Sequence, residues 1–283
     1  MNNIPKPLAK DLRFNFIYEY CVTIVFCVLS FVPDMFDPNY QEFIEQDISI
    51  SHSYTDDVSS IWFYVAYFVP LLICTILVVI FDTHSKWMYF NVTCVLSLKN
   101  LFLVKLVCGI LQNFFGRPRP NAFAMCGYTK DSGSALHVYG YPGRVASIDN
   151  CKQSISLIRA AFRSFPSSYA ALGMAGAVLS ILLLSQFSVV FELYNRYFLK
   201  VFRFFLFAII LVIPIRVSVI LTEHNMNFTD DILAGFLIGI CISYFTVKQY
   251  YTNTTSLYMP LRQSINMPDI EVHNIHVPKD NKL

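Results

Sequence analysis

Charge is scarce in this chain, and its scarcity excludes most soluble proteins. Of the 283 residues, 14% are charged and 55% are hydrophobic, whereas a soluble domain carries roughly 25% charged residues. The shortage predicts an integral membrane protein. A basic cluster is also missing and the formal net charge is only +2, so we expect no nucleic-acid partner. The first apolar segment, 14–33, is too long for the core of a secretory signal peptide and lacks a small-residue cleavage site, so we expect it to be retained as a helix.

Apolar segments long enough to cross a membrane make up much of the chain. A helix needs about 20 mostly apolar residues to cross the hydrocarbon core. In the third candidate we expect Lys99 to snorkel to an interface, while Lys105 must face the bundle or a polar cavity, as must Arg216 in the fifth. The sequence therefore predicts an all-α bundle of six transmembrane helices at 14–33, 61–81, 88–111, 168–187, 199–221 and 231–248.

The loops between these segments predict the orientation. Lysine and arginine gather on the side of both termini, whereas the loops 34–60 and 222–230 carry none. The loop 112–167 carries seven, but we discount it because it is long. We therefore expect a cytosolic amino terminus (1–13), a membrane domain (14–248) whose loop 112–167 faces the lumen or exterior, and a disordered cytosolic tail (249–283).

Two of the eight cysteines lie outside the apolar segments. Cys126 and Cys151 share the loop 112–167, whereas the other six lie in or beside apolar segments, where a thiol usually packs as a small apolar group. On the expected oxidising side a disulfide is permitted. We predict that these two cysteines pair; two free loop thiols are the alternative.

An arginine-rich string follows the third apolar segment. In Gly116-Arg117-Pro118-Arg119-Pro120 the prolines fix the backbone, and two guanidinium groups suit bidentate binding of phosphate. Taken alone, the string is equally compatible with a basic pair that touches lipid headgroups.

Two further strings begin the fourth and sixth apolar segments. Arg163 is followed by Pro166-Ser167-Ser168-Tyr169, which opens a helix whose first amides can bind an anion or simply be capped. Asp230 and Asp231 begin the last segment, where carboxylates complement the helix dipole.

The order and spacing of the three strings resemble the signature blocks of the type 2 phosphatidic acid phosphatase superfamily, the lipid phosphate phosphatases, and most closely their plant and fungal branch. The family's blocks read Lys-x6-Arg-Pro, Pro-Ser-Gly-His and Ser-Arg-x5-His-x3-Asp, and Arg119-Pro120, Pro166-Ser167 and Asp231 match parts of them. The resemblance implies a six-helix bundle of the lipid phosphate phosphatase and vanadium haloperoxidase type. It also implies a phosphatidate-like lipid partner, and neither a metal nor a cofactor.

Several positions depart from these blocks. In the family a histidine attacks phosphorus, an aspartate orients it, and a second histidine protonates the leaving oxygen. An amide cannot form that covalent intermediate, and fewer cations leave the phosphoryl charge less well neutralised. The substitutions are Gln112 for the lysine, Ser168 and Tyr169 for the glycine and histidine of the second block, Leu221 for the arginine, and Asn227 for the nucleophilic histidine.

We therefore expect a catalytically impaired relative that binds a phospholipid phosphate headgroup or serves as a membrane scaffold. Arg117, Arg119, the amides near Ser167 and Ser168, and Asp231 are retained, and Arg163 adds charge. The alternative is an active phosphatase of phospholipid metabolism in which His224 replaces the nucleophile, because in a helix it would lie nearly one turn from Asn227; His137 is a second candidate. A transporter or channel would need matched helix breaks, which the sequence does not show.

Overall fold

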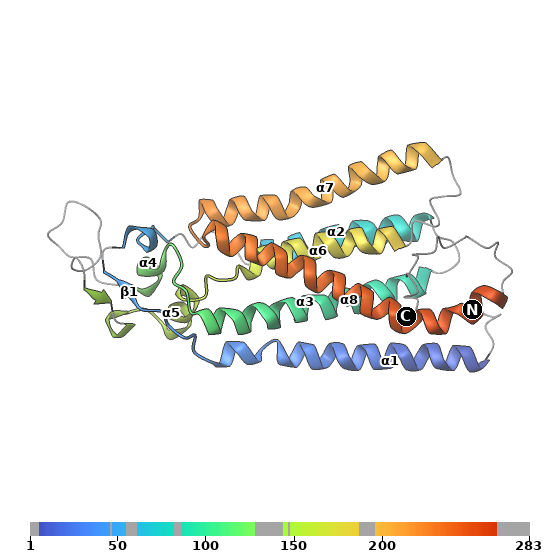
Figure 1. Cartoon of the computed structure of the whole chain (residues 1–283), viewed down its shortest axis with the longest axis horizontal. Coiled ribbons are helices and arrows are strands. Elements are labelled where there is room, and N and C mark those ends of the chain that lie inside the picture. Colours follow the sequence, from blue (N-terminus) through green and yellow to red (C-terminus); the bar gives the residue numbers. More distant parts are fainter. Residues whose placement is uncertain are drawn as a thin grey trace, which may run out of the picture. The chain divides into compact units, whose positions relative to one another are not determined.

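The computed structural model describes residues 6–45, 47–54, 61–81, 86–127, 144–146, 148–186 and 196–264. The chain divides into two compact units, Met1–Lys248 and Gln249–Leu283. The all-α fold is confirmed. The long helices in the described ranges are α1 (Lys6–Leu29), α2 (Ile61–Phe81), α3 (Lys86–Phe115), α6 (Ser168–Gln186), α7 (Arg196–Glu223) and α8 (Thr229–Ser264) (Figure 1).

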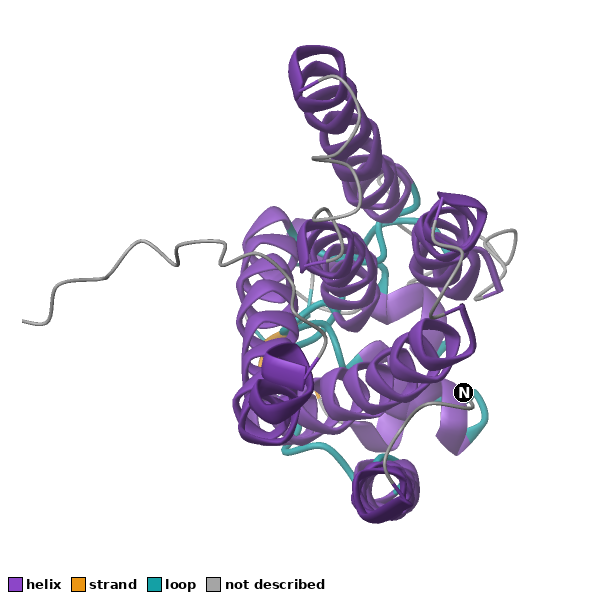
Figure 2. Ribbon diagram, turned by 90° about the vertical axis from the view of Figure 1, so that its right-hand side faces the viewer, coloured by secondary structure: helices purple, strands orange, loops and turns teal. Residues whose placement is uncertain are grey.

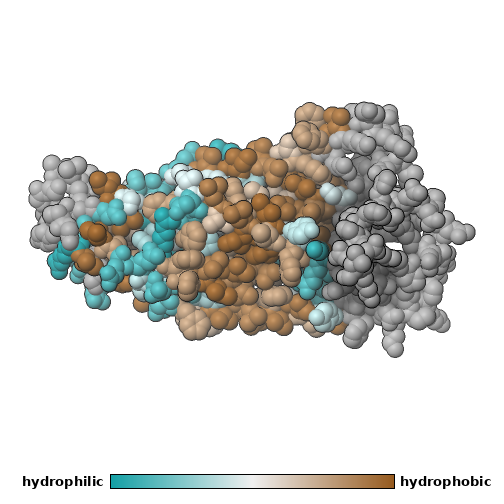
Figure 3. All heavy atoms as spheres, in the orientation of Figure 1, coloured by the Kyte–Doolittle hydropathy of each residue, from teal (hydrophilic) through white to brown (hydrophobic). Residues whose placement is uncertain are grey.

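Five of these helices carry stretches long and apolar enough to cross a membrane. In α2 the corresponding stretch of described residues, Phe63–Ile76, is shorter. Apolar residues cover the long helices in Figure 3, and hydrophilic residues gather at the end that carries α4, α5 and β1. The chain is therefore a multi-pass membrane protein. The five stretches are Ile17–Met35, Phe90–Phe115, Ser168–Ser185, Phe204–Glu223 and Thr229–Tyr250.

Helix α6 forms the centre of the bundle and contacts α2, α3 and α7. Its membrane stretch is 61% buried, more than any of the other four. Small residues allow this burial, since they let helix backbones approach closely. A Cβ atom at Gly176 would lie 2.7 Å from the carbonyl oxygen of Tyr67 in α2, and one at Gly239 in α8 would lie 2.5 Å from that of Ala171 in α6. Figure 2 views several of these helices nearly end-on.

Short elements form a cap at one end of the helices. They surround an aromatic core in which the Phe43 ring lies 5.4 Å from the rings of both Phe123 and Phe162. Cys126 and Cys151 form a disulfide beside this core, with their Cα atoms 5.0 Å apart. The elements are η1 (Val32–Met35), β1 (Phe43–Ile44), η2 (Ile48–Ile50), α4 (Ala122–Cys126), β2 (Val145–Ala146), η3 (Ile148–Asn150) and α5 (Ile155–Ala161), with β1 antiparallel to β2.

A buried ion pair joins α1 to α3 inside the bundle. Lys99 Nζ lies 3.0 Å from Glu19 Oε2, and the two side chains are only 3% and 8% exposed. The prediction that Lys99 snorkels to an interface is therefore wrong, because α1 supplies a carboxylate within the bundle. Lys105 instead reaches the cap, where it lies 3.4 Å from Asp34 and 4.0 Å from the centre of the Phe31 ring.

We expect the protein to lose considerable stability when only one partner of the Lys99–Glu19 pair is removed. Lys99→Met would leave the Glu19 charge buried without a partner and should lower stability by about 3–5 kcal/mol. The double variant Lys99→Met/Glu19→Met should recover most of this loss. Unfolding of the detergent-solubilised protein measures both effects.

Lys105→Met is the matched control, because this side chain is 32% exposed and its ion pair should contribute at most about 1 kcal/mol. A double variant no more stable than either single variant would contradict the role given to the pair.

Candidate functional site

The three sequence strings meet where α3 ends and where α6 and α8 begin. Gly116 turns the chain after α3 with a φ of +58°. Only glycine fits there, because a Cβ atom would lie 1.6 Å from the carbonyl oxygen of Asn39. The turn brings the string that contains Arg117 beside the segment that leads into α6, where the Ser164 amide donates to the Arg117 carbonyl oxygen at 3.1 Å.

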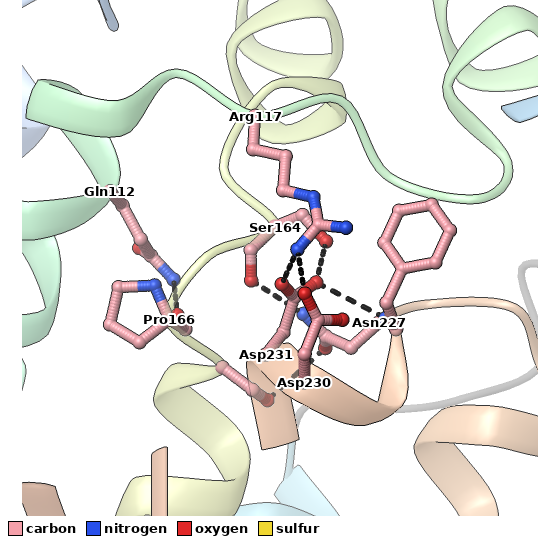
Figure 4. A network of polar contacts seen from close by, with 9 residues as sticks. Gln112, Arg117, Ser164, Pro166, Asn227, Asp230 and Asp231 are labelled. Atoms are coloured by element: carbon pink, nitrogen blue, oxygen red, sulfur yellow. Dashed lines mark hydrogen bonds and ion pairs between the residues drawn. The ribbon is translucent and has the colours of Figure 1, made fainter. Parts of the chain in front are cut away.

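A buried carboxylate joins all three strings (Figure 4). Asp231 is 0% exposed, and its Oδ1 accepts from Arg117 Nη1 at 2.7 Å. Its Oδ2 accepts from the Ser164 hydroxyl and from the Phe228 amide at 3.1 Å. The Asp231 carbonyl oxygen also accepts from the Ser167 amide at 3.0 Å. Buried charge is stable only when it is paired and hydrogen-bonded, and Asp231 meets that condition with donors from three segments.

Arg117 binds two neighbouring carboxylates with one nitrogen. Its Nη1 contacts Asp230 Oδ2 as well as Asp231 Oδ1, and its guanidinium carbon lies 4.5 Å from the centre of the Phe228 ring. Asp230 is the exposed partner, because its side chain is 61% exposed whereas that of Asp231 is 0% exposed. Arg117 is therefore present as expected, but its guanidinium is already paired with two carboxylates of the chain itself.

Asn227, which the sequence predicts to stand in place of the family's nucleophilic histidine, is a structural bridge. Its Nδ2 donates to the Ser164 carbonyl oxygen at 2.7 Å, and its Oδ1 accepts from the Ser167 hydroxyl at 3.2 Å. Ser167 also caps α6, since its Oγ accepts from the Ala170 amide at 3.4 Å, and Ser168 is the first residue of that helix. The amide group of Asn227 therefore holds the start of α6 in place.

Neutral side chains fill the other substituted positions. Gln112 is 8% exposed and donates to the Pro166 carbonyl oxygen at 2.8 Å. The Tyr169 ring stacks on that of Phe63, with centroids 4.1 Å apart, and packs beside the fully buried Leu221. Gln112 therefore forms a backbone contact, and Tyr169 and Leu221 belong to an apolar cluster.

Arg119 differs from Arg117 in its surroundings. Its Nε is buried and has no hydrogen-bond partner within the described ranges. Burial lowers the pKa of the Arg119 guanidinium, and the nearby Tyr169 and Asp231 partly offset that shift. An anion placed at this guanidinium would therefore gain a charge-assisted hydrogen bond that the chain itself does not supply at Nε.

Arg163 also forms contacts with the cap. Its Nη1 lies 3.2 Å from Asp34 Oδ1, and its Nη2 donates to the carbonyl oxygens of Pro33 and Phe36, each at 3.0 Å. These bonds fasten η1 to the segment before α6. Arg163 therefore anchors the cap, and its part in phosphate binding stays a prediction.

The helical spacing assumed for the histidine alternative is also wrong. Helix α7 ends at Glu223, and Asn225 has a φ of +52° in the left-handed region. His224 and Asn227 therefore lie in a turn between two helices, not on one helix face. His137, the second candidate, lies outside the described residues.

Residues 93–255 match the model of the PAP2 superfamily. The search of curated proteins and the search of solved structures find no match. In the part of the chain that the structure describes, no group of three or more histidine, cysteine or acidic residues is placed to hold a metal ion.

We expect Asp231 to be far more important for stability than its neighbour. Asp231→Asn replaces one acceptor oxygen with an NH₂ group, which would face N–H and O–H donors that the carboxylate now satisfies. The free energy of unfolding should therefore fall by about 1–3 kcal/mol. Asp230→Asn changes the same charge at an exposed site and should cost at most about 1 kcal/mol. Equal unfolding midpoints for the two variants in detergent would show that the buried network is not what holds the strings together.

Proposed function

Because the chain belongs to the PAP2 superfamily, we propose that it binds the phosphate headgroup of a phosphatidate-like membrane lipid without hydrolysing it. The observation that carries this proposal is the contrast between Arg119 and Asn227. Among the residues that the structure describes, the buried Nε of Arg119 has no partner, while Asn227, the residue expected in place of the nucleophile, has an amide engaged in two hydrogen bonds.

The loss of hydrolysis follows from the chemistry of the substituted residues. Covalent catalysis on phosphorus needs a nucleophile with an available lone pair, and the amide nitrogen of Asn227 instead donates to the Ser164 carbonyl oxygen. Phosphoryl transfer also depends on cations that neutralise the equatorial oxygens. Gln112 and Leu221 supply none at two of those positions. Loss of the cations would slow the reaction, and loss of the nucleophile removes its covalent step.

Binding needs less than catalysis and can survive these losses. A guanidinium presents parallel donors that match phosphate oxygens, and Arg117 and Arg119 lie on one short string next to the start of α6. Each charge-assisted hydrogen bond contributes about 1.5–3 kcal/mol. Two arginines without the family's lysine and third arginine therefore support binding of modest affinity.

The experiment uses the purified protein in mixed detergent–lipid micelles. With dioctanoyl phosphatidate we expect phosphate release at the background rate and an unfolding temperature that rises with ligand concentration. Arg119→Gln should weaken this binding at least about tenfold, because it removes one charge-assisted bond.

Arg144→Gln is the control, since it removes an exposed arginine of the cap. Release that depends on His224 would establish the active-phosphatase alternative. Equal binding by the wild type and Arg119→Gln would refute the anion site. If no phosphatidate binds at all, a scaffold role becomes the better account.

We also propose that the cap and the site face the lumen or exterior and that both termini are cytosolic. The distribution of lysine and arginine supports this orientation, and the Cys126–Cys151 disulfide supports an oxidising side.

In sealed vesicles with the cytosolic face outward, a protease should remove a tag placed after Leu283. Cys126 and Cys151 should react with an impermeant thiol reagent only after permeabilisation and reduction. If the tag and both cysteines are reached from the same side of intact vesicles, the proposed orientation is wrong.

A further inference from the structure

We propose that Asp230 is an internal competitor for the anion site: its carboxylate occupies Arg117 in the empty protein and must leave when a phosphate binds. This inference rests on the proposed function, and it concerns how the same site is controlled. Figure 4 shows Asp230 and Asp231 side by side beneath the guanidinium of Arg117.

The two carboxylates on Arg117 are not equivalent. Asp231 is fully buried and also accepts from Ser164 and from the Phe228 amide, so its departure would leave buried donors without an acceptor. The Asp230 side chain is 61% exposed and forms its ion pair with Arg117 at the surface. Only Asp230 can leave at low cost, because water can solvate it directly.

The chemistry of the contact favours exchange with phosphate. A guanidinium binds carboxylate and phosphate through the same kind of charge-assisted hydrogen bond. A phosphomonoester carries about −1.5 to −2 charges at neutral pH and more acceptor oxygens than a single carboxylate, so it can take the place of the Asp230 carboxylate on Arg117.

Arg117 can receive such a ligand without rebuilding the site. Its side chain is 31% exposed, so part of it already faces solvent. The contacts with Asp231 and with the Phe228 ring position the guanidinium, and neither depends on Asp230. When the carboxylate of Asp230 turns away, Arg117 therefore stays in place.

The first arm of the test needs no ligand. In Asp230→Asn, Arg117 should react with phenylglyoxal, a guanidinium-specific reagent, about two to five times faster than in the wild type, the range expected for loss of one exposed ion pair. Peptide mass spectrometry identifies the modified residue. Unchanged reactivity of Arg117 would overturn the inference, whatever the protein binds.

The second arm measures binding of inorganic phosphate and of dioctanoyl phosphatidate by thermal shift. Dioctanoyl phosphatidylcholine, whose zwitterionic headgroup has no net charge, is the comparison. Asp230→Asn should bind both phosphate ligands about two to five times more tightly than the wild type. A gain for inorganic phosphate shows that the headgroup alone is recognised, and a gain confined to phosphatidate shows that the lipid is required.

Asp37→Asn is the matched control. Asp37 is also about half exposed and forms an ion pair with one arginine of the cap, Arg159, so its substitution changes the net charge equally without freeing Arg117. It should alter neither Arg117 reactivity nor phosphate binding.

The two proposals fail in different ways. If the wild type binds phosphate and Asp230→Asn binds it no better, the competitor role is wrong and the proposed function stands. If Arg117 becomes reactive in Asp230→Asn but neither protein binds phosphate or phosphatidate, the proposed function is wrong and the competitor role falls with it.

Discussion

The buried carboxylate of Asp231 is the contact on which the rest of the site depends. It binds Arg117 from the segment after α3, Ser164 from the segment before α6, and the Phe228 amide from its own helix start. Three segments far apart in the sequence are thereby fixed at one end of the bundle. Without a carboxylate at this position, several buried donors from these segments would have no acceptor.

The substituted residues form a consistent structure of their own. The Asn227 amide and the Gln112 amide both hold backbone carbonyls of the segment that leads into α6, and Tyr169 and Leu221 join one apolar cluster. Here the replacements hold the framework in place, and this supports a protein that keeps the shape of a phosphate site without its reaction.

Sequence alone was sufficient to locate the long apolar helices, because apolar length leaves a strong signal. It was wrong about where the last one ends: α8 continues to Ser264, into the tail that we expected to be disordered. It could not identify the partner of Lys99, since nothing in α1 marks Glu19 as the residue that faces α3. It could not show that Arg163 would anchor the cap. The motif match distinguished Asp231 from Asp230, but it could not show which of the two is buried, because neighbouring helix residues point about 100° apart and only the packing decides their burial.

Native mass spectrometry tests the central claim most directly. The protein in micelles would be incubated with equal amounts of phosphatidate and phosphatidylcholine, and the mass of the protein and of its bound lipid would be read in one spectrum. Our account predicts intact phosphatidate bound to an unmodified chain, with clearly less bound to Arg119→Gln. A phosphorylated chain, or diacylglycerol in place of phosphatidate, would contradict it.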